Sequence, residues 1–241
     1  MSGHSKWAQI KRQKGVADIK RGQAFTKISN AITIAVKQGG GATDPGQNFR
    51  LRLAIEKARG LNMPRENIER AIQRASGKQA GEIEEVVYEG FAPFGVSVII
   101  EAATDNKQRT ASEIKNVFDK AGGTLAQPGA VSYQFQPTGK IMLKKESHTL
   151  DDVFLSAAES GAEDVGEMGD AFVVYTKASD LTKVSEALSA KGFSVIQTEL
   201  SKRPISPVVI GEAEKLAKIR SFIAKLEEMD DVQKVYSNLG I

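Results

Sequence analysis

The residues of this sequence that could do chemistry are mostly lysines and arginines, and a dense group of them opens the chain. Lysine offers a mobile point charge and arginine a bidentate donor, and both suit phosphate groups. In a helix Lys11 and Lys14 would share a face, as would Lys6 and Lys14 about two turns apart. The first 21 residues therefore form the strongest candidate phosphate-binding segment, with the cations Lys6, Lys11, Arg12, Lys14, Lys20 and Arg21.

The charge of the whole chain is divided unevenly along its length. Residues 1–78, which we call the head, contain 16 Lys or Arg and five Asp or Glu, a net charge of +11. Residues 79–241, which we call the body, contain 17 bases and 25 acids, a net charge of −8, so that the total of +3 hides the asymmetry. A basic head of this kind predicts a polyanionic partner, most simply nucleic acid. The alternative is a set of solvated helix faces.

Two further groups of cations are candidates. Arg52 and Arg59 are seven residues apart and would lie on one helix face, where surface charge and phosphate contact are equally good explanations. Lys107 and Arg109 stand where a strand gives way to a helix, and helix N-termini attract anions. The nearby Asp105 and Asn106 are also good cap residues, so a purely structural role competes there.

The sequence nominates no catalytic or metal site. There is no P-loop, no G-x-G-x-x-G after a strand, no G-x-S-x-G and no H-E-x-x-H. Zero cysteines exclude thiol catalysis and Cys-ligated zinc, and the two histidines, His4 and His148, are too far apart in sequence to suggest a His-rich metal site. We therefore expect no enzyme, no cofactor and no small-molecule substrate.

Targeting signals are also missing from the sequence pattern. No apolar run is long enough to predict a membrane span, and the basic N-terminus lacks the apolar stretch of a secretory signal. We therefore expect a cytoplasmic protein that does not contact a membrane.

The elements that position the head cations are predicted to be helices. Apolar residues at helical spacing predict a helix over residues 24–38. Asp44 and Pro45 predict the start of a second helix that ends at Gly60. A third helix is expected over residues 64–77, completing a small bundle with basic outer faces.

The first 23 residues, the arm, differ from this bundle. They are polar and interrupted by Gly15 and Gly22, so we expect a short helix near Trp7–Lys14 within a mobile arm that orders on a polyanion. Trp7, the only tryptophan, could stack on a base or anchor packing, and packing is the commoner role.

The body is predicted to mix strands and helices. Val86–Phe91 and Val96–Ala102 read as a hairpin around residues 92–95. A helix with a capping box at Thr110 follows, and Val131–Phe135 reads as a strand.

Residues 139–203 predict a complete βαββαβ unit of the ferredoxin-like kind. Its expected strands are Lys140–Lys144, Glu163–Glu167, Ala171–Thr176 and Ser194–Leu200, and its helices are Leu150–Glu159 and Asp180–Lys191. The tail then predicts a short strand at Val208–Ile210, a helix, and a last strand at Val232–Tyr236.

These elements predict an α+β protein of three domains. The first is the helical head, residues 1–78. The second is a discontinuous α/β domain of residues 79–135 and 205–241, since neither half alone could bury a good core. The third is the βαββαβ domain of residues 136–204, inserted into the second.

Several motifs resemble those of one family. The opening Met1–Lys27 (MSGHSKWAQIKRQKGVADIKRGQAFTK) closely resembles that of the YebC family, also called the YebC/PmpR or TACO1 family. Further matching segments are Arg52–Ile72, Tyr88–Val98 (YEGFAPFGVSV), Thr104–Thr110 (TDNKQRT) and Gly129–Phe135 (GAVSYQF). The resemblance spans essentially the whole chain.

The resemblance implies a cytoplasmic, non-enzymatic, three-domain protein that binds DNA and regulates transcription. Other members of the family act in translation, so it also implies an alternative, a ribosome-associated factor that helps synthesis at difficult, proline-rich sequences. Gln9, Gln13, Ser29-Asn30 and Gln108 depart from the family pattern and slightly reduce the basic surface.

We therefore predict a nucleic-acid-binding regulatory protein. Its partner is DNA, ribosomal RNA or both, and the ribosome itself is the alternative partner. The contact residues that we predict are Lys6, Lys11, Arg12, Lys14, Lys20, Arg21, Lys27, Arg52, Arg59, Lys107 and Arg109.

Overall fold

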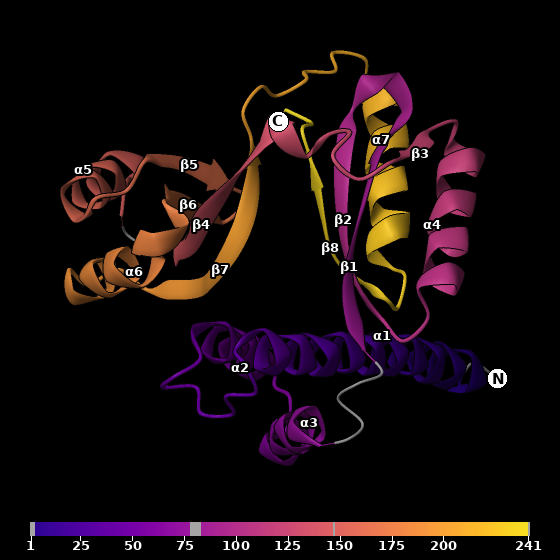
Figure 1. Cartoon of the computed structure of the whole chain (residues 1–241), viewed down its shortest axis with the longest axis horizontal. Coiled ribbons are helices and arrows are strands. Elements are labelled where there is room, and N and C mark those ends of the chain that lie inside the picture. The colour runs from indigo at the N-terminus through magenta and orange to yellow at the C-terminus, as the bar shows by residue number, and fades with distance from the viewer. Residues whose placement is uncertain (1–2, 78–82, 147, 241) are drawn as a thin grey trace. The chain divides into compact units, whose positions relative to one another are not determined.

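The structure is a computed structural model, and it describes residues 3–77, 83–146 and 148–240 (Figure 1). For residues 3–19 it describes the backbone alone. Helices and two antiparallel four-stranded sheets make up the described chain, which confirms the predicted α+β class.

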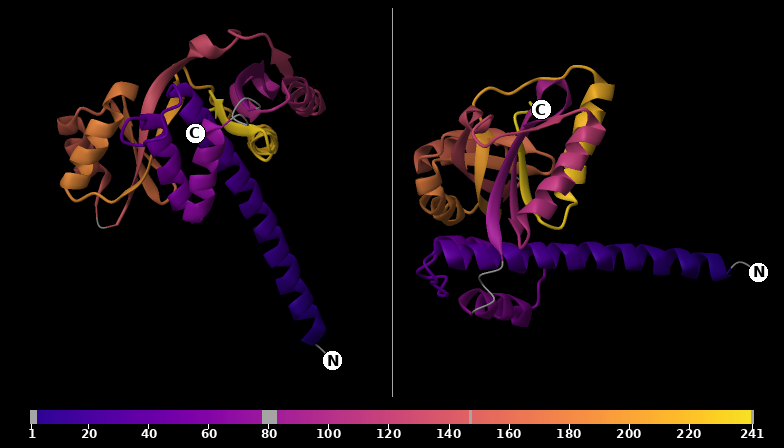
Figure 2. Two further views of the ribbon diagram at one scale, coloured as in Figure 1. Left: turned by 60° about the horizontal axis from the view of Figure 1, so that its bottom comes forward. Right: turned by 45° about the vertical axis from the view of Figure 1, so that its right-hand side comes forward.

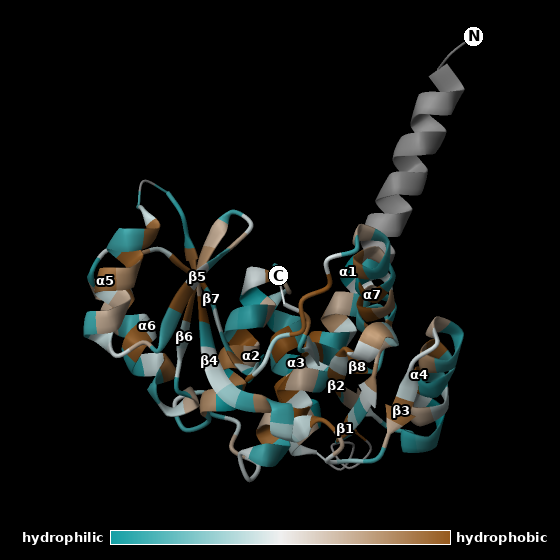
Figure 3. Cartoon of the chain, turned by 90° about the horizontal axis from the view of Figure 1, so that it is seen from above, coloured by the Kyte–Doolittle hydropathy of each residue, from teal (hydrophilic) through white to brown (hydrophobic). Residues whose placement is uncertain are grey.

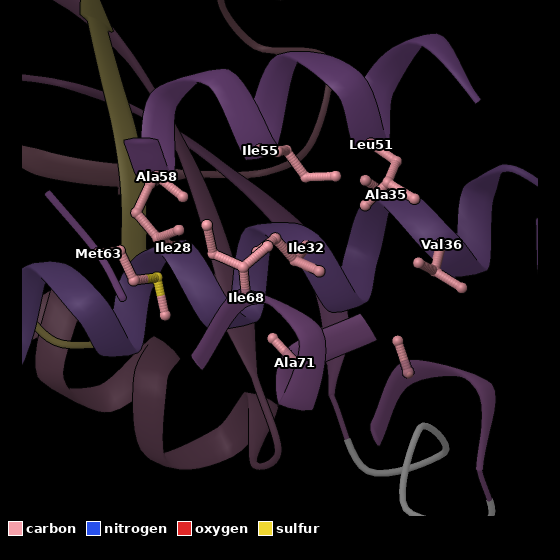
Figure 4. Close-up of a cluster of buried hydrophobic side chains, with 11 residues drawn as sticks. Ile28, Ile32, Ala35, Val36, Leu51, Ile55, Ala58, Met63, Ile68 and Ala71 are labelled. Carbon is pink, nitrogen blue, oxygen red and sulfur yellow. The ribbon is translucent and has the colours of Figure 1, made fainter. Parts of the chain in front are cut away.

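The described part of the head contains three helices, α1 (Gly3–Gln38), α2 (Phe49–Gly60) and α3 (Arg65–Ser76). Their apolar faces meet in one buried cluster, drawn in Figure 4. Ile32, Val36 and Leu51 are fully buried at its centre, and burying a side chain of this size stabilises a fold by about 1.5–3 kcal/mol. The predicted bundle is thus confirmed, and its packing leaves the basic side chains to the outside. The buried members of the cluster are Ile28, Ile32, Ala35, Val36, Leu51, Ile55, Ala58, Met63, Ile68, Ala71 and Ala75.

The first helix is longer than predicted. We expected a short helix near Trp7–Lys14 within a mobile arm and a separate helix over residues 24–38, but α1 runs without a break over 36 residues (Figure 2). A single glycine inside a helix costs about 1 kcal/mol relative to alanine, and without a terminating cap it does not end the helix.

The second helix starts four residues later than the prediction. Asp44 accepts a hydrogen bond from the Gly46 amide at 2.9 Å and so closes a turn, whereas the N-cap is Asn48. The buried Asn48 side chain accepts from the Leu51 amide at 3.0 Å and donates to the Ala35 carbonyl at 2.9 Å. Asn48 therefore both begins α2 and fixes it to α1.

One sheet has the order β3-β1-β2-β8. Its strands are β1 (Glu84–Phe91), β2 (Ser97–Thr104), β3 (Thr124–Ala126) and β8 (Val232–Ser237). The predicted hairpin is confirmed, with the 3-10 turn η2 (Pro93–Gly95) between β1 and β2. Phe94 in that turn adopts φ +64°, a left-handed conformation that is strained for a bulky residue.

The segment between the sheets differs from the prediction. Val131–Phe135 is not a strand: the 3-10 turn η3 (Ser132–Gln134) lies there, and β4 begins only at Phe135. The reason is the buried carboxylate of Glu89, which accepts backbone hydrogen bonds from Gly129, Val131 and Ser132 at 2.9, 2.7 and 2.9 Å. Amides that point together at one carboxylate cannot also donate along a strand ladder.

The helix α4 (Lys107–Ala121) also starts earlier than predicted. The capping side chain is Asn106, whose oxygen accepts from the Arg109 amide at 3.0 Å. Thr110 instead lies in the first turns of the helix, and its hydroxyl bonds to Thr104 at 2.8 Å. The second helix of this region is α7 (Ala213–Glu227), and Val208 forms only an isolated bridge to Leu239 rather than the predicted strand.

The second sheet has the order β5-β6-β4-β7. The chain order β4, α5, β5, β6, α6, β7 gives the ferredoxin-like arrangement and confirms the predicted βαββαβ pattern. Both helices carry hydrophobic and hydrophilic faces (Figure 3). The bounds are β4 (Phe135–Lys144), α5 (Leu150–Ser160), β5 (Asp164–Met168), β6 (Ala171–Thr176), α6 (Leu181–Ala190), with the 3-10 turn η4 (Ala178–Asp180) before it, and β7 (Val195–Pro204).

By compactness the chain divides into two units. One comprises residues 1–87, 100–117 and 223–235, and the other comprises residues 88–99, 118–222 and 236–241. These units group the chain differently from the three domains expected from the sequence, so the predicted domain boundaries stay a prediction.

Candidate nucleic-acid interface

The arm cations lie on the N-terminal part of α1. The backbone of Lys6, Lys11, Arg12 and Lys14 is helical, but their side chains lie outside the described residues. Lys20 and Arg21 follow on the same helix and are exposed. Neither side chain makes a hydrogen bond or an ion pair with another described residue. Both charges are therefore available to a phosphate.

Lys27 is placed differently, although it belongs to the same helix. Its side chain is half-buried, and its Nζ donates to the carbonyl of Glu227, the last residue of α7, at 2.5 Å. Burial lowers the pKa of Lys27, and nearby Lys57 lowers it too, against the opposing carboxylates of Asp230, Glu227 and Glu228. Lys27, one of the predicted phosphate contacts, is therefore already engaged by other residues of the protein.

On α2 the two predicted cations have different surroundings. The guanidinium of Arg52 lies over the ring of Phe49, 5.3 Å from its centroid, and is half-exposed. Such a cation–π contact holds the guanidinium in place but leaves its donors usable. Arg59 is exposed in the last turn of the helix, and no hydrogen bond or ion pair engages its side chain within the described part of the chain.

The third helix adds a cation that the sequence reasoning missed. Arg65 pairs with Glu69 at 2.7 Å, and Arg70 donates to the Glu66 carbonyl at 3.3 Å. Arg74, four residues after Arg70, is exposed, and its side chain forms neither kind of contact with any described residue. The signal in the sequence was that Arg74 has no acidic residue three or four positions before or after it, whereas Arg65 has Glu69 and Arg70 has Glu66 four positions away.

At the N-terminus of α4 both predicted cations are paired. Lys107 contacts Glu84 at 2.5 Å, and Arg109 contacts Asp105 at 2.8 Å and Asp231 at 3.0 Å. A phosphate at this helix end would have to compete with these three carboxylates. The surroundings thus favour the structural role that the cap residues suggested.

Asp231 is the centre of that arrangement. Its carboxylate also accepts from the hydroxyls of Thr110 at 2.6 Å and Thr104 at 3.1 Å. Burial by itself raises the pKa of Asp231, but the hydrogen bonds from Thr110, Arg109 and Thr104 outweigh it and the pKa is lowered. The carboxylate thus ties α4 to the turn before β8.

Two other kinds of site are absent from the described residues. No group of three or more His, Cys, Asp or Glu side chains there could hold a metal ion. Nor is any helix among them long and apolar enough to cross a membrane.

Comparison with known proteins places these features in one family. The model of the TACO1/YebC protein N-terminal domain matches residues 5–78, and the model of the TACO1/YebC second and third domain matches residues 83–239. A relative from Persephonella marina, named "Probable transcriptional regulatory protein", is 47% identical over 240 residues, covering 99% of this chain and 95% of its own.

Two further comparisons agree with this assignment. A relative of the same name from Chloroflexus aurantiacus is 48% identical over 244 residues, covering all of this chain and 96% of its own. The crystal structure of a conserved hypothetical protein from Aquifex aeolicus superposes with a TM-score of 0.86 at 41% identity, covering 93% of this chain and 92% of that one. The chain belongs to the TACO1/YebC family.

Proposed function

We propose that this protein is a nucleic-acid-binding regulator of transcription, with its basic head on the phosphate backbone of DNA. The name shared by its relatives supports regulation of transcription. The alternative expected from the sequence, a translation factor on ribosomal RNA, would use the same phosphate chemistry, but those names do not favour it. We further propose that the protein has no catalytic activity and acts in the cytoplasm, in keeping with a sequence without cysteine.

The observation that carries the proposal is the set of exposed head cations whose side chains have no partner among the described residues. Lys20 and Arg21 on α1, Arg59 on α2 and Arg74 on α3 are all exposed, and no other described residue neutralises them. Removing such side chains from water costs little when a phosphate replaces the water, and condensed counterions are released from the DNA.

The proposed contacts position the protein on the backbone and do not read bases. Lysine and arginine contacts to phosphate fix register and orientation but carry no sequence information. We keep the eleven residues predicted from the sequence as the proposed contact set and add Arg74. Lys107 and Arg109 are its weakest members, because both already pair with carboxylates.

Binding of the full chain to a short mixed-sequence duplex DNA, titrated over a range of salt concentrations, tests the proposal. Changing Lys20, Arg21, Arg59 and Arg74 together to Ala should flatten the plot of log K against log salt by roughly three to four units, since each phosphate contact contributes about 0.9. A matched variant, with Lys120, Lys177, Lys183 and Arg220 changed to Ala, removes the same charge from exposed positions of the body.

The two variants separate local contacts from net charge. The control should keep the salt slope of the wild-type protein. Equal slopes for both variants would show that the head cations are only solvated, and the proposed interface would be wrong. A parallel titration with a folded RNA of similar length measures the preference between the two nucleic acids.

A further inference from the structure

One cation of the head is already held by an acidic turn of the body. Lys27 donates to the Glu227 carbonyl at the end of α7, and Gln23 donates to the Asp230 carboxylate at 3.1 Å. Gln23 and Lys27 are four residues apart on α1 and so share a face. Residues 227–231, the last residue of α7 and the turn after it, are called the acidic turn here. They receive two side chains from one face of α1.

The electrostatic surroundings of Lys27 are those of an occupied cation site. The carboxylates of Asp230, Glu227 and Glu228 all act on its ammonium group. A cation at the C-terminal end of a helix also interacts favourably with the helix dipole and with the last carbonyl groups. A phosphate that takes Lys27 must therefore replace both the carbonyl of Glu227 and the field of these acids.

The acidic turn is itself firmly held. Asp231 accepts from Thr104, Thr110 and Arg109, and its carbonyl accepts from the Ala103 amide at 2.8 Å. Because these bonds fix the turn to β2 and α4, it cannot simply follow Lys27 when the lysine moves. Nucleic acid and the turn therefore compete for one side chain.

We propose that the acidic turn is an internal competitor of nucleic acid for Lys27, an autoinhibitory contact that lowers the affinity of the head. This inference rests on the proposed function. It divides the cations of α1 into two kinds: Lys20 and Arg21 are open to phosphate, and Lys27 becomes available only when its contact with α7 breaks.

The variant Asp230→Asn tests the competition. Asparagine keeps an oxygen that can accept from Gln23 but removes the charge that helps to hold Lys27. Affinity of the full chain for the short duplex DNA should rise about two- to fivefold, the size of one exposed charge interaction. In a Lys27→Ala background the same change should have no effect, so the two substitutions should be coupled in a double-mutant cycle.

A control and a folding measurement make the result decisive. Glu186→Gln on α6 removes the same charge from an exposed side chain that has no partner among the described residues, and thermal unfolding checks that each variant is folded. If Asp230→Asn binds no tighter than Glu186→Gln, the acidic turn does not compete. Weaker binding by Asp230→Asn would also overturn the inference, because the turn would then hold α1 in its binding geometry.

The binding of the wild-type chain distinguishes a wrong proposed function from a missing internal competition. If the wild-type chain does not bind duplex DNA or folded RNA at all, the nucleic-acid role itself is wrong, and the competition falls with it. If the wild type binds with a steep salt dependence and only the Asp230→Asn effect is missing, the proposed function stands and the internal competitor does not.

Discussion

The head and the body use charged side chains in opposite ways. In the head the core is apolar, built from residues such as Ile32 and Leu51, and several cations face solvent without a partner among the described residues. In the body two carboxylates, Glu89 and Asp231, are largely buried and accept several hydrogen bonds each. Charge in the head is available for binding, whereas these charges of the body hold the fold together.

The difference shows that counting charges is not enough to find an interface. Lys107 and Arg109 are as cationic as Lys20 and Arg21, but carboxylates of the body already pair with them. An exposed cation counts toward phosphate binding only if no neighbouring acid competes for it. Substitutions in the head and in the body test this contrast.

The largest effect is expected from the arm. Changing Lys11, Lys14 and Arg21 together to Ala should flatten the salt slope on duplex DNA by about two to three units and weaken binding at physiological salt roughly a hundredfold. Gel-shift or anisotropy titrations of the full chain at several salt concentrations measure both quantities. These substitutions should not unfold the helix of the arm, because alanine is the best helix former.

A matched variant of the body controls for the loss of net charge in the arm variant. A body variant with Lys120, Lys177 and Lys183 changed to Ala removes the same charge and should keep the wild-type slope. If the arm variant also keeps it, the arm cations touch no phosphate, and the contrast between head and body loses its functional meaning.

The next largest effect is expected on protein stability, from a substitution in the body. Glu89→Gln replaces one carboxylate oxygen with an NH₂ group that faces backbone donors, so one or more buried amides lose their acceptor. We expect the free energy of unfolding to fall by about 2–4 kcal/mol, measured by urea denaturation. Glu113→Gln, an exposed position on α4, is the control and should change stability little; equal losses would mean that the Glu89 hydrogen bonds do not stabilise the fold.

Acid should destabilise the protein by protonating the carboxylates of Glu89 and Asp231. Burial raises the pKa of Glu89, but hydrogen bonds from Val131, Gly129 and Ser132 outweigh it and lower the pKa, as those on Asp231 do for that residue. Because their pKa is lower in the folded state, the ionised carboxylates contribute their full stabilisation above the unfolded-state pKa, near pH 4. This stabilisation is lost as the pH falls through the folded-state pKa.

The test of this acid dependence is urea unfolding at a series of pH values from neutral downward. The wild-type protein should lose stability steadily below about pH 5. A Glu89→Gln, Asp231→Asn double variant should start lower and show a shallower loss over the same range. Parallel curves for the two proteins would mean that other acids control the acid sensitivity.

Much of the fold could be predicted from the sequence, because apolar spacing reports which face of an element is buried. The stripe that contains Ile28, Ile32 and Val36 predicted the helix and its core face, and the run of aromatic and β-branched residues in Ala171–Thr176 predicted β6 with the bounds found in the structure. Spacing was less informative in the arm, where glycines suggested breaks in a helix that is continuous.

The sequence could not predict where some helices start or which cations are paired, because both depend on contacts between residues that are far apart in the sequence. Asn48 rather than Asp44 caps α2 since its side chain also reaches the Ala35 carbonyl on α1. In the same way, the pairing of Arg109 with Asp231 joins residues 122 positions apart. A sequence shows which side chains carry charge but not which charges meet.

The smallest effect is expected where charges do meet, at the N-terminus of α4. Arg109→Ala should change the salt slope on duplex DNA by less than about 0.3 and the affinity by less than about twofold, since a phosphate contact would contribute about 0.9 to the slope. Stability should fall slightly instead, because Asp231 loses a donor that lowers its pKa. Lys107→Ala, which breaks the pair with Glu84, should behave in the same way. A slope that flattens by about one unit in either variant would show that the ion pair opens on binding, and that paired cations of the body serve the interface as the exposed cations of the head do.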